Sequence, residues 1–281
     1  MKLKPRLQTV ILLLFCLIFS SLAGMAQNQG NCETGEFGHN PHVGQSYAIR
    51  GISLYVEHYG KGEPLVLLHG NGGSMANFAC QIPFFEKNYH IIAIDSRAQG
   101  KSVDRGDSLS FEMMADYVSA LLDNLKLDSC NLLGWSDGGI TGLMLAMRHP
   151  EKVRKLAVTG ANLWPDTTAI RKEDFLWMRH YHDSLGTIPH TPEVTNSRKL
   201  VALDLFQPNI TKEQLKQIHC QTLVIGGDHD IIPPEHTTLI SRFIPGSYLW
   251  IVPASGHATL IDHKDLFNQV VGDFFGNGFR Y

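Results

Sequence analysis

The stretch "LLGWSDGG", residues 132–139, joins an apolar run to a Gly-x-Ser-x-Gly pattern, and a helix-like segment follows it. A strand that turns sharply into a helix at a serine exposes that serine for nucleophilic attack. Gly134 and Gly138 leave room for such a turn, because glycine tolerates unusual backbone angles. The turn would hold the Ser136 hydroxyl at a helix N-terminus, where peptide dipoles favour negative charge. In the alternative interpretation, Ser136 only caps the helix that begins at 138.

Short apolar runs alternate with helical patterns on both sides of this stretch. This alternation predicts a mostly parallel sheet with helices on both faces, so the fold class is α/β. We expect a β-hairpin over 47–60 and strands at 65–70, 90–95, 130–134, 155–161, 221–227 and 248–252. Helices are expected at 111–125, at 138–150, after Pro234 and at 262–275.

Residues 162–219 interrupt this alternation. They carry short helical stretches and no strand pattern, as an inserted helical cap would. The predicted core therefore consists of 46–161 and 220–281.

Two further strands end in residues that could activate a serine. A serine hydroxyl is a poor nucleophile until a base takes its proton, and that base needs an acid to orient it. The run "VIGGDHDIIPP" (224–234) ends in an acidic loop, and "IVPASGH" (251–257) ends in a histidine. Open α/β sheets build their sites at the carboxyl ends of strands. We therefore predict a catalytic triad of Ser136, Asp230 and His257, with Asp228 as the alternative acid.

The glycine-rich run "HGNGGS" (69–74) is the candidate for the loop that stabilises an oxyanion. The backbone N–H of Asn71 is the first choice for one donor and that of Gly72 the second. The other donor would be the N–H of Asp137, the residue after the nucleophile. An ordinary flexible turn is the alternative. No lysine and Ser/Thr pair closes the glycines, which argues against a phosphate-binding loop.

Five segments together resemble the successive signatures of the α/β-hydrolase fold superfamily. This resemblance spans about 47–275 and implies an eight-stranded, mostly parallel sheet and a serine hydrolase that needs no cofactor. Ala98 stands where the superfamily usually has glycine, and the serine at 136 disfavours the members with a nucleophilic aspartate. The segments are "LVLLHGNGGS", "IAIDSRAQGKS", "LLGWSDGG", "LVIGGDHDIIPP" and "ASGHATL".

The aspartate that follows Ser136 needs its own explanation, because a carboxylate there would oppose a developing oxyanion. The segment "GWSDGGITGL" is similar to the elbow of the valacyclovirases, the biphenyl hydrolase-like amino-acid ester hydrolases. That resemblance implies that Asp137 binds the α-amino group of a substrate. The alternative is a first-turn helix residue that favours the dipole and faces a lysine or arginine of the protein.

The N-terminus has the three-part pattern of a secretory signal peptide over residues 1–26. Lys2, Lys4 and Arg6 precede ten apolar residues, and "AGMA" (23–26) suits cleavage after Ala26. Ten residues are too few for a membrane span, which needs about 20. We therefore expect an exported protein, periplasmic or secreted, with a flexible leader over 27–45.

The remaining composition excludes several classes of partner. The net charge of −3 comes without any basic run, which argues against nucleic acid. No CxxC or HExxH pattern occurs, so neither a metal nor another cofactor is expected. Cys130 and Cys220 each begin an apolar run and are predicted to be buried. Cys32 could pair with Cys80 after export, but their spacing does not indicate it.

These observations predict an exported serine hydrolase that acts on small carboxylic esters, with α-amino-acid esters as the narrower prediction. A carbon–carbon bond hydrolase or a cofactor-free perhydrolase on the same triad is the alternative enzyme. A ligand-binding protein with this fold is the alternative outside enzymes.

Overall fold

The computed structural model describes residues 32, 36–104, 106, 108–276 and 278–279. The predicted signal peptide lies outside these residues. Residues 35–281 form one compact unit.

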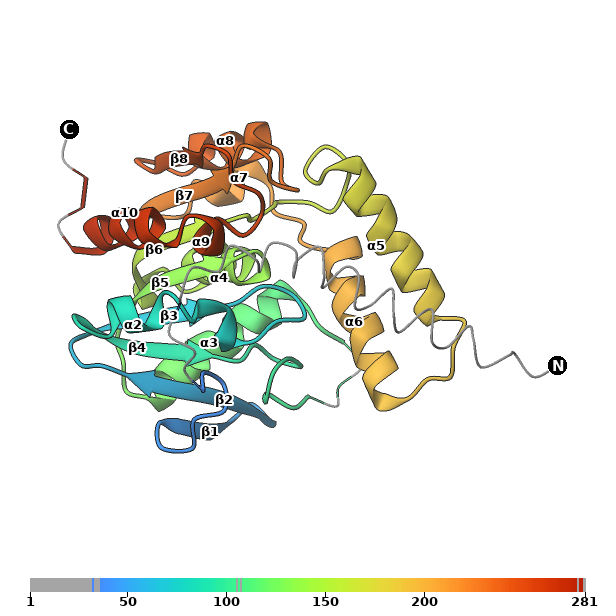
Figure 1. The fold of residues 1–281 in the computed structure, drawn as a ribbon, viewed down its shortest axis with the longest axis horizontal. Helices are drawn as coiled ribbons and strands as arrows, with labels where there is room; N and C mark the ends of the chain where they lie inside the picture. The colour runs from blue at the N-terminus through green and yellow to red at the C-terminus, as the bar shows by residue number, and fades with distance from the viewer. Residues whose placement is uncertain (1–31, 33–35, 105, 107, 277, 280–281) are drawn as a thin grey trace. The chain divides into compact units, whose positions relative to one another are not determined.

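An eight-stranded sheet in the order β1-β2-β4-β3-β5-β6-β7-β8 forms the centre of this unit (Figure 1). β2 runs antiparallel to both of its neighbours, and every other pair is parallel. This confirms the predicted α/β-hydrolase sheet. The strands are β1 Gly44–Ile49, β2 Ile52–Tyr59, β3 Glu63–Leu68, β4 Tyr89–Ile94, β5 Cys130–Trp135, β6 Val153–Thr159, β7 Gln221–Gly227 and β8 Tyr248–Val252.

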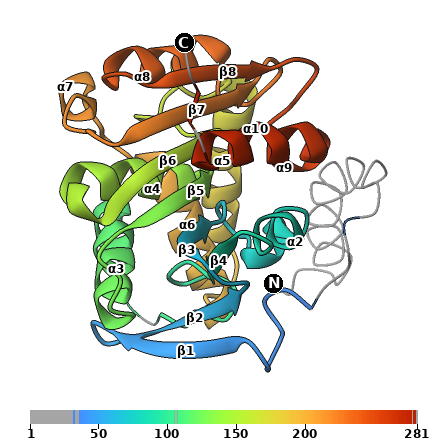
Figure 2. The same ribbon diagram turned by 90° about the vertical axis from the view of Figure 1, so that its left-hand side faces the viewer.

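Helices cover both faces of the sheet (Figures 1 and 2). One face packs on α3 (Phe111–Asn124), α4 (Asp137–Arg148) and α8 (Pro234–Phe243). The other packs on η2 (Met75–Phe78), α2 (Ile82–Phe85), α9 (Thr259–Asp262) and α10 (Lys264–Gly276). The central strands are apolar without alternation because both of their faces are buried.

Two helix predictions can be compared in detail. Ser110 caps α3 as expected, since its side chain accepts the backbone N–H of Met113. The helix predicted over about 262–275 corresponds to α10, which begins at Lys264, and the short α9 before it was not predicted. The break falls at His263, whose φ of −124° and ψ of 37° do not continue a helix.

The segment between β6 and β7 carries α5 (Lys172–Leu185), α6 (Pro192–Phe206) and the short α7 (Lys212–Leu215). α5 and α6 pack on each other through Leu185, Val201 and Leu205. Polar contacts attach α6 to the core: the Asn196 amide donates to the Ala98 carbonyl at 2.8 Å. No strand occurs among these residues, which fits the role expected of an inserted cap.

The leader predicted as flexible over 27–45 is ordered in its described part. Glu57 is fully buried, and its carboxylate accepts the backbone N–H groups of Gly38 (2.7 Å) and Asn40 (2.8 Å). The hydroxyls of Tyr55 and Tyr59 donate to the same carboxylate. The two backbone bonds hold the chain before β1 against the sheet, and the two tyrosine hydroxyls of β2 satisfy the remaining acceptor capacity of the carboxylate.

Among the helices described, none is long and apolar enough to cross a membrane.

Candidate active site

Ser136 sits at a strained turn between β5 and α4, with φ 55° and ψ −120°. A side chain at either flanking glycine would not fit. A Cβ on Gly134 would lie 2.2 Å from the Gly138 carbonyl oxygen, and one on Gly138 would lie 1.9 Å from that of Leu68. Strain of this kind costs of order 1–3 kcal/mol and persists only where packing enforces it. The Ser136 side chain makes no capping bond to α4, contrary to the alternative interpretation.

Instead, the Ser136 hydroxyl faces His257 in the loop after β8. Oγ of Ser136 lies 3.0 Å from Nε2 of His257, and Nδ1 of His257 lies 2.6 Å from Oδ1 of Asp230. Asp230 is 4% exposed, and Oδ1 also accepts the N–H of Ile232 at 3.0 Å. The structure thus brings the three predicted residues together in the order serine, histidine and acid.

The electrostatic surroundings of His257 favour its protonated form. Burial lowers the pKa of His257, but the carboxylates of Asp230 and Asp137 outweigh burial and leave this pKa above the ordinary histidine value. A base that gains a proton beside a fixed carboxylate is well suited to hold the proton of an attacking serine.

Asp228, the alternative acid, has a different task. Its carboxylate accepts the backbone N–H groups of Ala254 and Ser255, at 3.0 Å each, in the loop that leads to His257. These two bonds lower the pKa of Asp228. Asp228 therefore contacts the backbone of the histidine loop, and Asp230 contacts the imidazole.

The loop predicted to stabilise an oxyanion lies against the nucleophile. A Cβ on Gly70 would lie 3.1 Å from the Cβ of Ser136. Asn71 follows Gly70, and its side-chain amide donates to Oδ2 of Asp137 at 2.9 Å. Gly72 has a φ of +66°. Both predicted donors, the N–H groups of Asn71 and Asp137, thus belong to segments adjoining Ser136. Asp137 is the first residue of α4, and the first N–H groups of a helix have no hydrogen-bond partner within the helix, so its N–H is available to an oxyanion.

The Asp137 side chain is buried, at 2% exposure, and points to residues that the sequence did not identify. Besides Asn71, it is hydrogen-bonded to Asp204 on the cap helix α6. Burial raises the pKa of Asp137, and burial together with the neighbouring Asp137 carboxyl raises that of Asp204 further. The other charged group that acts on Asp137 is His257. The lysine or arginine partner considered above is thus replaced by an amide and a second carboxyl.

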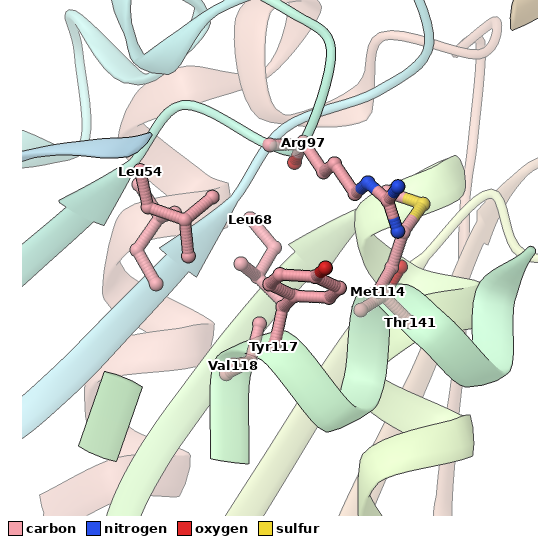
Figure 3. A pocket seen from close by; sticks show the side chains of 9 residues that line it. Leu54, Leu68, Arg97, Met114, Tyr117, Val118 and Thr141 are labelled. Atoms are coloured by element: carbon pink, nitrogen blue, oxygen red, sulfur yellow. The ribbon is translucent and has the colours of Figure 1, made fainter. Parts of the chain in front are cut away.

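A separate small pocket lies beside α3 (Figure 3). The guanidinium of Arg97 stacks over the ring of Tyr117 at 4.7 Å and donates to Asp104 at 2.7 Å. No triad residue lines this pocket, so we do not assign the substrate to it. Its lining residues are Leu54, Leu68, Ile94, Ser96, Arg97, Met114, Tyr117, Val118 and Thr141.

Comparison with known proteins agrees with this fold. A family model described as the alpha/beta hydrolase fold matches residues 63–190. The chain thus has the α/β-hydrolase fold, and the relatives that it resembles are hydrolases. Serine hydrolase BPHL of Mus musculus is 29% identical over 245 residues, which cover 81% of this chain and 84% of the relative. The 2-hydroxymuconate semialdehyde hydrolase of a Pseudomonas species is 26% identical and covers 84% of this chain and 94% of its own.

Solved structures show the same fold. A hydrolase from Pseudomonas aeruginosa superposes with a TM-score of 0.72 at 20% identity, covering 84% of this chain and all of its own. A meta-cleavage product hydrolase from Pseudomonas fluorescens gives a TM-score of 0.69 at 23% identity, covering 85% of this chain and 99% of its own.

Proposed function

We propose that this hydrolase is an exported serine esterase that cleaves small carboxylic esters through an acyl-enzyme. The observation that carries the proposal is the position of His257, within hydrogen-bond distance of both Ser136 Oγ and Asp230 Oδ1. A bridging imidazole is what a serine needs to become a nucleophile at neutral pH.

In the first half-reaction, Ser136 Oγ attacks the ester carbonyl while His257 Nε2 takes the hydroxyl proton. The carbonyl oxygen becomes an oxyanion, which accepts hydrogen bonds from the backbone N–H groups of Asn71 and Asp137. His257 then gives its proton to the departing alcohol, and the acyl group stays on Ser136. Asp230 holds the imidazole in the required tautomer and stabilises its charged form.

In the second half-reaction, water takes the place of the alcohol. His257 removes a proton from the water as it attacks the acyl carbonyl, and the same N–H groups stabilise the second oxyanion. Transfer of that proton to Ser136 Oγ releases the carboxylic acid and restores the enzyme. Every proton moves between His257 Nε2, Ser136, water and the alcohol.

Substrates with a free α-amino group are the favoured subset. Asp137 adjoins Ser136, is buried, and lacks a lysine or arginine among the charged groups acting on it. A buried carboxylate without a cationic partner is costly, so a substrate ammonium would find a favourable site there. The resemblance of the elbow to amino-acid ester hydrolases supports the same assignment.

The test compares ethyl valinate with ethyl 3-methylbutanoate, the same ester without its amine. We expect kcat/KM to be at least about tenfold higher for the valinate, near 1.4 kcal/mol of transition-state discrimination. Asp137→Asn should remove that preference, and Ser136→Ala should abolish both activities. Equal rates on the two esters would leave a general esterase, while full activity of Ser136→Ala would overturn the serine mechanism.

A carbon–carbon bond hydrolase is the second candidate, and the similarity to the 2-hydroxymuconate semialdehyde hydrolase favours it. The same triad would act on a ring-cleavage dienone. A kcat/KM for such a dienone above that for both ethyl esters would replace the esterase proposal with this one.

Export is proposed from the sequence of residues 1–26. Cys80 is in disulfide form, a state that oxidising compartments maintain. Cys130 and Cys220 are free thiols; Cys130 is buried, as predicted, and Cys220 is half-buried. Expression of the whole chain should give a protein outside the cytoplasm that begins at Gln27, as checked by N-terminal sequencing of each cell fraction. An intact N-terminus in the cytoplasmic fraction would contradict export.

A further inference from the structure

The four residues 70–73, in the loop after β3, include one with a side chain, Asn71. Residues 70–73 are Gly-Asn-Gly-Gly, and their turn is closed by a backbone bond from Gly73 N to Gly70 O at 3.2 Å. A Cβ on Gly72 would meet nothing within 4 Å. Glycine-rich backbone is conformationally permissive, so the direction of an N–H group in this loop depends on contacts made by other atoms. Nδ1 of His69 lies 2.7 Å from the carbonyl oxygen of Gly70, before the turn. Within residues 70–73 themselves, Asn71 is the residue that offers such contacts from a side chain.

Both donors of the Asn71 amide are used, and they bind different parts of the molecule. Nδ2 donates to Oδ2 of Asp137 at 2.9 Å and to the backbone carbonyl of Leu200 at 3.0 Å. Asp137 is the first residue of α4, directly after the nucleophile. Leu200 lies within the cap helix α6. An amide NH2 group has two hydrogens, and both take part in these bonds. The same side chain is also hydrogen-bonded to Asp204, a second residue of α6.

We infer that Asn71 is a positioning residue that couples the docking of the cap helix α6 to the geometry of the oxyanion site. Its side chain fixes the direction of its own backbone N–H relative to Ser136, and one of its two anchors exists only while α6 lies against the core. The inference rests on the proposed function, in which that N–H binds the oxyanion. Donors must lie within a few tenths of an ångström of their ideal place, so a loosened loop would lower the rate of the chemical step.

Another asparagine provides a matched control. Asn196 also lies on α6, and its amide also donates to a core carbonyl, that of Ala98, at 2.8 Å. It binds the loop after β4, however, and not the loop that carries Asn71. Loss of the Asn196 amide should therefore remove a different contact of α6 and leave both hydrogen bonds donated by the Asn71 amide in place.

The experiment measures kcat and KM of Asn71→Ala and Asn196→Ala on the better of the two ethyl esters. We expect Asn71→Ala to lose about 10- to 100-fold in kcat, since removal of a whole oxyanion donor costs roughly 100- to 1,000-fold. KM should change by less than about threefold, and kcat of Asn196→Ala should stay within about threefold of the wild type. Hydrogen exchange of peptides from 192–206 should become faster in both variants, and thermal melts establish that both are folded.

The isosteric substitution Asn71→Asp separates positioning from simple support of the fold. The introduced carboxyl keeps the shape of the amide but places an acceptor opposite Asp137 at high pH, so kcat should fall below that of Asn71→Ala. At low pH its protonated form donates again, so the ratio of its kcat to that of the wild type should rise as pH falls. A residue with a purely structural role would lower the melting temperature without this pH-dependent ratio.

The outcomes distinguish this inference from the proposed function. If the wild type hydrolyses esters, Ser136→Ala does not, and Asn71→Ala keeps the kcat of the wild type, the inference is overturned and the proposed function stands. Equal losses of kcat in Asn71→Ala and Asn196→Ala would also overturn it, since cap docking by itself would then explain the effect. A wild-type protein that hydrolyses no ester and resists a serine-reactive phosphonate would overturn both.

Discussion

Nδ1 of His257 lies 2.6 Å from Oδ1 of Asp230, while the carboxylate of Asp228, two residues before Asp230, binds the backbone of the histidine loop. The same short acidic loop therefore supplies one carboxylate to the imidazole and one to the loop that holds the imidazole in place. This division of tasks gives a direct comparison of two aspartates.

Asp230→Asn should lower kcat by about 10⁴, because an amide opposite Nδ1 favours the wrong histidine tautomer. Asp228→Asn should lower kcat by less than about tenfold and act mainly on the melting temperature, since it weakens two backbone bonds. Steady-state kinetics of both variants on one ester checks this. A larger loss of kcat in Asp228→Asn than in Asp230→Asn would contradict the assignment.

The pH dependence of activity should follow the raised pKa of His257. The base must be neutral to accept the Ser136 proton, so kcat/KM should fall as pH decreases through this pKa, with a midpoint above the ordinary histidine value. Asp137 contributes to raising this pKa. Asp137→Asn should therefore move the midpoint to lower pH, measured on the ester without an amine so that substrate recognition does not interfere. A midpoint that does not move would argue against this coupling.

The Asp137–Asp204 contact should destabilise the fold at neutral and alkaline pH. The pKa of Asp204 is raised in the folded state, so folding favours its protonated form. The contribution of Asp204 to the free energy of unfolding is therefore fully present below the pKa of an unfolded aspartate. It is lost as the pH rises through the raised pKa that Asp204 has in the folded state. Asp204→Asn should raise the melting temperature at pH 8 and leave it nearly unchanged at pH 4. For a chain of this size, each kcal/mol of stability corresponds to roughly 2–4 °C in melting temperature.

A control for this comparison is Asp183→Asn, whose carboxylate is 81% exposed. It should change the melting temperature little at either pH. Equal stabilisation by Asp204→Asn at pH 4 and pH 8 would show that charge on the pair is not the cause.

Gly138→Ala should prevent the elbow from forming. Its Cβ would lie 1.9 Å from the backbone oxygen of Leu68, which cannot move without disturbing β3. We expect an insoluble protein, or one whose melting temperature falls by more than about 10 °C, as a loss of several kcal/mol would produce. Gly276→Ala is the control, because a Cβ there meets nothing within 4 Å. A soluble Gly138→Ala with normal stability would disprove the close approach.

Glu57→Gln should destabilise the fold by roughly 3 kcal/mol, because a neutral amide cannot replace a buried carboxylate that accepts four hydrogen bonds. Denaturant unfolding measures this loss, and kcat of the folded protein should not change. Glu63→Gln, which breaks an exposed pair with Arg154, should cost less than about 1 kcal/mol. Equal losses in the two variants would mean that residues 38–40 are not held by Glu57.

The sequence by itself determined the fold class, most of the elements and the identity of the elbow. These features are local: an apolar strand, a glycine where backbone must pass close to backbone, and a serine between them are all found within 132–139. The residues that follow the two later strands also pointed to His257 as the base and to either Asp230 or Asp228 as the acid.

Tertiary structure alone decided what each polar side chain contacts. It chose Asp230 over Asp228, and it turned Asp137 toward Asn71 and Asp204, two partners that the sequence had not indicated. Asn71 is 66 residues from Asp137 and 129 from Leu200, and no local pattern encodes contacts at such separations. Packing of the cap helix on the core creates these contacts, because a side chain acquires its partners only when distant segments are brought within hydrogen-bond distance.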